Sequence, residues 1–139
     1  MLRTNLLLLA LTTLGTLSTR AQDALTTLAG SGKQQWTVIG SSSVADASCK
    51  AGDASYTFQA TPAQVMVKQC VGGAWKSGTE AVTNWSANGK SGIAFGGSKY
   101  EVKSLPGTAP ACKGNANCVR LVTVPDGKTD ATRTIYLAH

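Results

Sequence analysis

The chain has 139 residues, with 13 Lys and Arg against 7 Asp and Glu, and a formal net charge of +6. This length fits one domain, and 42% hydrophobic against 14% charged residues excludes a disordered tail. The single histidine is His139, so a hydrolase triad or a His-rich zinc site would depend on that one side chain. We therefore expect a protein that is not an enzyme and that uses no cofactor and no metal.

The first 21 residues have the features of a secretory signal rather than of a folded element. Arg3 supplies the positive charge, and residues 6–17 form an apolar run that is too short and too often interrupted for a membrane span. The sequence Thr19-Arg20-Ala21 has small residues at the two positions that a signal peptidase recognises, which predicts cleavage before Gln22. The predicted product is one domain, residues 22–139, that is secreted or periplasmic and has no membrane span.

The charge of this product is only mildly basic. Removing Arg3 and Arg20 with the signal lowers the net charge from +6 to +4. The remaining Lys and Arg residues are spread singly along the chain, whereas nucleic-acid-binding proteins concentrate them in a stripe. We interpret them as a solvated surface and expect no nucleic-acid partner.

The composition after the signal favours β-structure. Residues 22–139 contain ten Val and three Ile but only five Leu, and branched side chains suit a pleated, half-buried surface. Only one helix is indicated, a short one in which Asp23 caps the sequence ALTTLA and Gly30 ends it.

Alternating apolar and polar residues predict eight strands. The clearest is ASYTFQA at 54–60, where Tyr56 and Phe58 alternate with polar residues. In chain order, the predicted strands are residues 34–39, 54–60, 64–70, 80–85, 91–95, 99–103, 118–124 and 131–138. Asn88-Gly89 and Pro125-Asp126-Gly127 are typical of hairpin turns, because these residues tolerate positive φ. Strands and turns at this spacing predict an antiparallel barrel or sandwich.

Four cysteines in a small exported protein usually form two disulfides. Of the three possible pairings we favour Cys49 with Cys70 and Cys112 with Cys118, because the members of each pair are nearest in sequence. The alternative, a metal or redox site, is disfavoured because neither pair has C-x-x-C spacing and no internal histidine is present.

Three other motifs carry little weight. The segment Gly30-Ser31-Gly32-Lys33 resembles a phosphate-binding loop but fails the pattern at Thr27 and Gln34. The seven carboxylates show no pair of the kind that glycosidases use. Asn84-Trp85-Ser86 is a glycosylation sequon, which matters only in a eukaryotic secretory route.

The aromatic residues carry the ligand-binding hypothesis. Several occupy the inward phase of the predicted strands, where they either fill the core or line a cup for an apolar or planar ligand. The predicted ligand-binding residues are Trp36, Tyr56, Phe58, Phe95 and Tyr100.

The chain resembles the lipocalin-like domains of small secreted bacterial proteins, within the calycin group. The matching features are Trp36, Cys49 followed by Asp53, Tyr56-Thr57-Phe58, Cys70, Trp85 before Asn88-Gly89, Ile93, Phe95, Tyr100-Glu101-Val102, and the closing strands Val119 to Val124 and Thr134 to Leu137. They span most of residues 25–138. The chain departs from the lipocalin pattern in its Cys112 to Cys118 loop and in having Gln34-Gln35-Trp36 instead of Gly-x-Trp.

A weaker resemblance is to the small periplasmic inhibitors of secreted metalloproteases, which are also eight-stranded barrels with an early Trp and a cysteine bridge. The resemblance implies inhibition through the mature N-terminus, here Gln22 to Gly30. Both resemblances imply the same all-β fold. We therefore predict a small antiparallel up-and-down β-barrel of about eight strands, with a short N-terminal helix and two disulfides.

These observations give three functional hypotheses. The first is an exported, monomeric, non-enzymatic barrel that binds a small apolar molecule at its mouth. The second is a module that binds a secreted protein, such as a protease inhibitor acting through its N-terminal segment. The third is a structural envelope or matrix protein that assembles with itself.

Overall fold

The computed structural model describes residues 23–42, 49, 52–125 and 132–139. The predicted signal peptide, its cleavage before Gln22 and the turn residues Asp126-Gly127 lie outside this part of the chain. The described residues form an antiparallel sheet of nine strands, one short α-helix and one turn of 3-10 helix. The predicted all-β class is therefore confirmed.

The elements follow one another closely along the chain. They are α1 (Ala24–Ala29), β1 (Lys33–Ser41), β2 (Ser55–Gln59), β3 (Gln64–Val71), β4 (Ala74–Ala81), β5 (Thr83–Ala87), β6 (Lys90–Phe95), β7 (Ser98–Leu105), η1 (Pro110–Cys112), β8 (Cys118–Thr123) and β9 (Thr134–Ala138). The strand order is β4-β3-β2-β1-β9-β8-β7-β6-β5, and every neighbouring pair is antiparallel.

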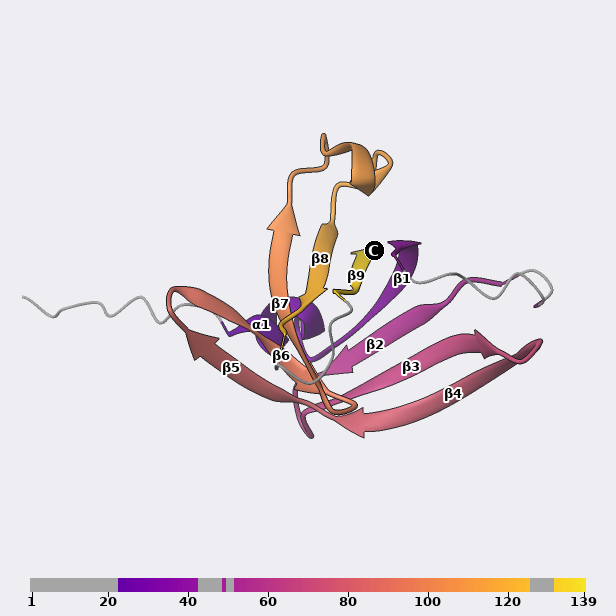
Figure 1. Cartoon of the computed structure of the whole chain (residues 1–139), viewed down its shortest axis with the longest axis horizontal. Helices are drawn as coiled ribbons and strands as arrows, with labels where there is room; N and C mark the ends of the chain where they lie inside the picture. The colour runs from indigo at the N-terminus through magenta and orange to yellow at the C-terminus, as the bar shows by residue number, and fades with distance from the viewer. Residues whose placement is uncertain (1–22, 43–48, 50–51, 126–131) are drawn as a thin grey trace, which may run out of the picture.

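Among the described residues the sheet curls strongly into a half-barrel, which is compatible with the predicted barrel, and its two end strands are not paired with each other (Figure 1). The two ends of the sheet are β4 and β5, which follow one another in the chain with only Val82 between them. The predicted strand over residues 80–85 is therefore divided at Val82, and this division gives nine strands instead of eight.

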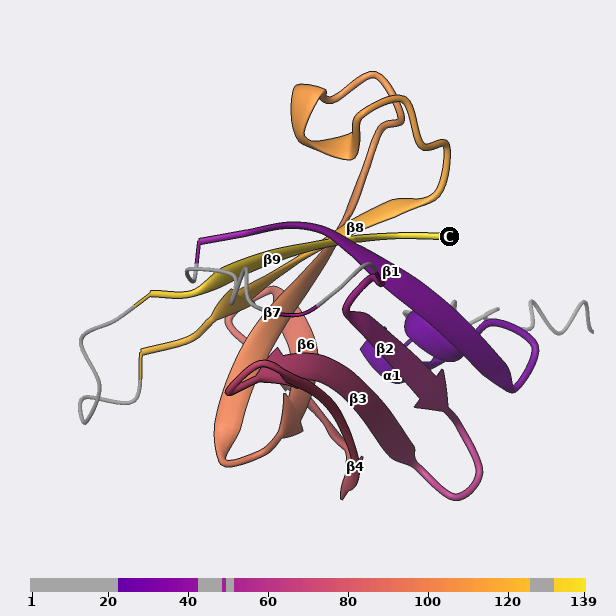
Figure 2. The same cartoon turned by 90° about the vertical axis from the view of Figure 1, so that its right-hand side faces the viewer.

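The helix forms where the capping residues predicted it. The Asp23 carboxylate accepts a hydrogen bond from the Thr26 backbone N–H at 2.7 Å, and Gly30 ends the helix with a φ of 58°. Its buried side chains pack against β1, β2, β5 and β6, and Figure 2 shows the helix beside β1 and β2. The helix thus bridges the two halves of the sheet at one end of the half-barrel.

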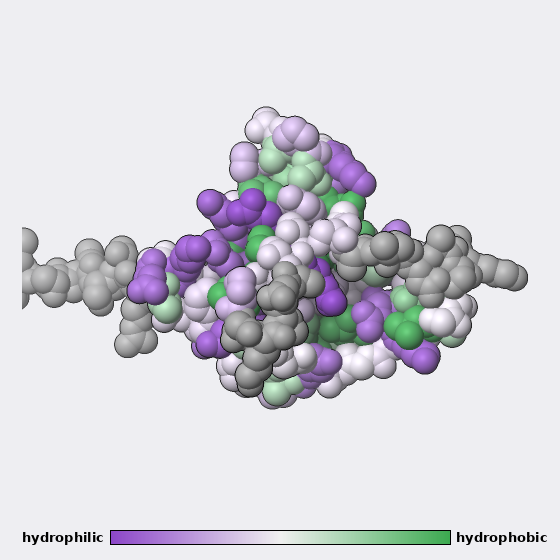
Figure 3. Space-filling view, viewed as in Figure 1, coloured by the Kyte–Doolittle hydropathy of each residue, from purple (hydrophilic) through white to green (hydrophobic). Residues whose placement is uncertain are grey.

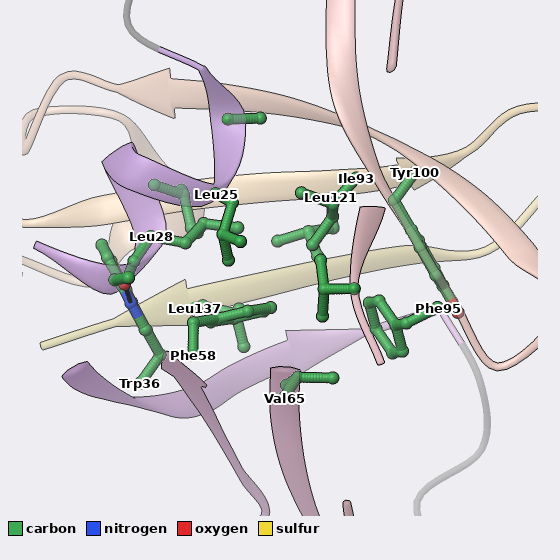
Figure 4. Packing of buried hydrophobic residues seen from close by; sticks show 14 of the residues in the cluster. Leu25, Leu28, Trp36, Phe58, Val65, Ile93, Phe95, Tyr100, Leu121 and Leu137 are labelled. Carbon is green, nitrogen blue, oxygen red and sulfur yellow. Dashed lines mark hydrogen bonds between the residues drawn. The ribbon is translucent and has the colours of Figure 1, made fainter. Parts of the chain in front are cut away.

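The core lies between the helix and the concave face of the sheet (Figure 4). Its largest completely buried side chains are Phe58, Leu28, Ile93, Leu121, Leu137 and Val65. Each of the five that lie in strands occupies the inward phase of its strand, as the alternation predicts.

Both predicted disulfides are present. Cys49 is joined to Cys70 at the end of β3, and Cys112 in η1 is joined to Cys118 at the start of β8. In the loop closed by the Cys112–Cys118 bridge, Lys113 donates a hydrogen bond from Nζ to the backbone oxygen of Ile39 at 2.7 Å. The bridges indicate an oxidising compartment.

The predicted Asn88-Gly89 turn joins β5 to β6, with φ values of 53° and 73°. Positive φ at both central residues is the geometry that a two-residue hairpin needs. In the part of the chain that the structure describes, no helix is long and apolar enough to cross a membrane.

Candidate functional site

The open side of the half-barrel contains a hollow of about 460 Å³, which we call the mouth. It lies between the inner face of β2, β3 and β4 and the hairpin that joins β6 to β7. Figure 3 shows apolar surface recessed between hydrophilic side chains on this face. The residues that line the mouth are Tyr56, Val67, Gln69, Lys76, Ser77, Gly78, Glu80, Phe95, Gly96, Ser98, Tyr100 and Arg133.

Three of the five predicted ligand-binding residues line this hollow. The rings of Phe95 and Tyr100 are stacked, with centroids 4.8 Å apart, and the ring of Tyr56 meets Phe95 edge-on at 6.1 Å. Phe95 and Tyr100 lie together at one end of the core (Figure 4). These rings form an aromatic wall of the mouth, in which Phe95 and Tyr100 are buried and Tyr56 is the half-buried ring that a planar molecule can contact.

The other two predicted residues are packed into the core. Phe58 is completely buried, and the indole N–H of Trp36 donates to the backbone oxygen of Leu28 at 2.7 Å. The His139 ring stands edge-on to Trp36, with centroids 4.3 Å apart. Neither Phe58 nor Trp36 lines the mouth.

The rim of the mouth is polar and carries charge of both signs. Lys76, Glu80 and Arg133 are exposed, and none of them forms an ion pair with another described residue. The scattered basic residues of the sequence predict a solvated surface for Lys76 and Arg133, and its pattern indicates no ligand role for Gln69 or Glu80. The one signal for Gln69 was its place in the inward phase of residues 64–70, two positions after Val67.

The Tyr56 hydroxyl group is influenced by its neighbours in the mouth. Burial raises its pKa above the ordinary 10.0, Tyr100 and Glu80 raise it further, and the positive charge of Arg133 opposes the rise. A phenol with the ordinary pKa of 10.0 is already protonated at neutral pH, and a raised pKa leaves it so. It can therefore donate a hydrogen bond to a ligand.

A second hollow of about 470 Å³ adjoins the mouth. Tyr56, Gln69 and Arg133 line both hollows and so stand where they meet. The second hollow extends toward Trp75 and Ile135. The two hollows are therefore neighbours that share these three side chains.

The helix bears on the inhibitor hypothesis, because most of the proposed N-terminal inhibitory segment is folded. Gln22 lies outside the described residues, but Ala24–Ala29 form α1, in which Leu25 and Leu28 are buried. The Leu25 backbone N–H also donates to Asn84 Oδ1 at 3.0 Å. Inserting this segment into a protease would require removing α1 from the core.

Groups of three or more His, Cys, Asp or Glu side chains that could hold a metal ion are absent from the described residues. All four cysteines are engaged in the two bridges. Comparisons of the chain with protein-family models, with curated proteins and with solved structures found no match to any of them.

Proposed function

We propose that this protein is an exported, non-enzymatic binding protein whose mouth takes up a small, largely apolar molecule. The observation that carries this proposal is a hollow of about 460 Å³ with the rings of Tyr56, Phe95 and Tyr100 in its wall. Small-molecule sites are commonly hollows of about 300–1,000 Å³ with apolar walls and a few polar groups that orient the ligand.

The polar rim refines the kind of ligand. An apolar body would lie against the aromatic wall and Val67, and one polar group would reach Gln69 or Arg133, where the two hollows meet. The hydroxyl group of Tyr56 would add a hydrogen bond. We therefore expect a ligand with a planar or chain-like apolar body and a single polar end.

The proposal can be tested with N-phenyl-1-naphthylamine, a neutral planar probe that fluoresces in apolar surroundings. Gln69→Trp places a large ring where the two hollows meet and should weaken binding of the probe at least tenfold. Met66→Trp is the matched control, because Met66 lies on the same strand and is 43% exposed on the outer face.

Two results would contradict the proposal. The first is that the unaltered protein does not bind the probe. The second is that Gln69→Trp binds it as tightly as Met66→Trp, which would place the probe elsewhere. Circular dichroism spectra of both variants should match that of the unaltered protein, so that a loss of binding is not a loss of fold.

A further inference from the structure

Strand β4 forms an open edge of the sheet. It pairs with β3 along its whole length, from Ala74 opposite Val71 to Ala81 opposite Gln64. In the strand order it has no neighbour on its other side among the described residues. It lies at the lower border of the molecule in Figure 1, and every residue in it except the half-buried Trp75 is exposed.

The sequence of this edge is complementary to itself in charge. Lys76 and Glu80 lie two residues before and two residues after Gly78. If a second copy of β4 paired antiparallel about a two-fold axis at Gly78, Lys76 of each copy would lie directly opposite Glu80 of the other. The symmetry produces this contact twice.

Lys76 and Glu80 lie on the same face of β4, where the Glu80 carboxylate lies beside Gly96 of the β6–β7 turn. Residues at even positions of β4 share one face of the strand, and Lys76, Gly78 and Glu80 all line the mouth. Neither Lys76 nor Glu80 is engaged in an ion pair with another described residue. Directly opposed unlike charges stabilise an antiparallel pair, and like charges destabilise it.

The position of the axis is not crowded on the face of the strand. A Cβ atom built on Gly78 would meet no heavy atom within 4 Å. Other registers are less favourable: an axis at Lys76 would place two lysines opposite each other, and one at Glu80 would oppose two glutamates. The charge pattern therefore selects Gly78 as the axis.

We infer that β4 is a self-association edge, through which two copies of the protein join antiparallel about Gly78 into one continuous sheet. The occupant of the edge is thus a second copy of this chain. The inference departs from the monomer that the sequence predicted, and it concerns residues that also line the mouth, because Lys76, Gly78 and Glu80 belong to both surfaces. Pairing would also satisfy the backbone groups that an open edge presents to other chains.

Charge reversal tests both the association and its register. Sedimentation equilibrium should show a monomer–dimer equilibrium for the unaltered protein. Lys76→Glu alone and Glu80→Lys alone should each weaken dimerisation about tenfold or more, because each variant places two like-charged pairs across the axis. The double variant restores opposite charges at both contacts and should dimerise like the unaltered protein.

Lys90→Glu is the matched control, because Lys90 is exposed on β6 and lies 3.6 Å from Glu101 of its own chain. It should leave dimerisation unchanged. A protein that stays monomeric up to millimolar concentration would overturn the inference. A dimer that ignores the single reversals, or that the double variant fails to restore, would overturn it as well.

Discussion

The two ends of the half-barrel differ in how deeply they bury the inward-facing side chains of the same strands. At the helix end, Phe58 on β2 is completely buried, and Trp36 on β1 is hydrogen-bonded to Leu28 of α1. At the mouth, Tyr56, also on β2, is only half-buried and faces Gln69 and a charged rim. Tyr56 and Phe58 are two residues apart on the same face of one strand.

This difference shows that strand alternation determines which way a side chain faces but not how deeply it is buried. The depth depends on what covers the end of the sheet. Because α1 fills the gap between the two halves of the sheet, inward residues near it become core. No helix of the described residues covers the mouth, and its inward positions include the polar Gln69 and the charged Lys76 and Glu80.

The largest expected effect is a loss of stability at the helix end. Leu28→Ala should lower the free energy of unfolding by about 2–5 kcal/mol, because the completely buried side chain leaves a cavity between α1 and the sheet. Urea denaturation followed by circular dichroism measures this change. Met66→Ala, on the exposed outer face of β3, should change the same quantity by less than about 0.5 kcal/mol. Equal effects would mean that α1 does not close this end.

A smaller effect is expected from the cap of the same helix. Asp23→Ala removes the hydrogen bond from the carboxylate to the Thr26 N–H and should cost about 1 kcal/mol at neutral pH. Thermal denaturation of the two proteins measures the difference. If Asp23→Ala costs nothing, the helix does not depend on this cap.

The pH dependence of this second effect has a definite sign. Hydrogen bonds from the side chain and backbone of Thr26 lower the pKa of Asp23 below its ordinary 3.8. A lowered pKa in the folded state means that the stabilisation is present above pH 3.8 and is lost as the pH falls through the folded-state pKa. The stability difference between the unaltered protein and Asp23→Ala should therefore shrink in acid.

The smallest effect on stability is expected at the mouth. Arg133→Gln should change the free energy of unfolding by less than about 0.5 kcal/mol, because the side chain is exposed and unpaired among the described residues.

The same variant should raise the pKa of Tyr56 further, since the positive charge that opposes the rise is gone. Ultraviolet titration of the phenols measures this, with Lys103→Gln on β7 as the charge-matched control. An unchanged titration would show that Arg133 does not face Tyr56.

Local chemistry made parts of this fold predictable from the sequence. The Asp23 cap, the Asn88-Gly89 turn and the nearest-neighbour cysteine pairs depend on residues that are close together in the chain. The alternation of residues such as Phe58 gave the positions of most strands. In the cap and the turn the deciding interactions lie within one element or between two adjacent ones, whereas the Cys49–Cys70 bridge spans 21 residues.

Strand β4 escaped prediction over most of its length for a physical reason. Its sequence AWKSGTEA has no apolar alternation because the strand is exposed on both faces. It is ordered by pairing with β3 across a tight turn at Gly72 and Gly73, whose φ values are 60° and 79°. A strand that is ordered mainly by backbone hydrogen bonds to its neighbour need not show alternating apolar and polar residues in its own sequence.

The site was predictable only in part. The argument that inward aromatic residues are candidates for a ligand pocket selected Tyr56, Phe95 and Tyr100, which line the mouth, and also Trp36 and Phe58, which do not. Separating these two outcomes requires knowing that α1 covers one end. Arg133 reaches the mouth from a position 77 residues after Tyr56, a proximity that arises only from the assembled sheet.

Val82 is the one residue between β4 and β5, the two end strands of the sheet. It is buried, and its backbone N–H donates to the oxygen of Ala63 at 3.1 Å. A ligand that displaced β4 from the β6–β7 hairpin would change the backbone at Val82 first, because the chain passes through this residue from one end of the sheet to the other. Amide hydrogen exchange at Val82, measured with and without N-phenyl-1-naphthylamine, would therefore report whether β4 moves when the probe binds.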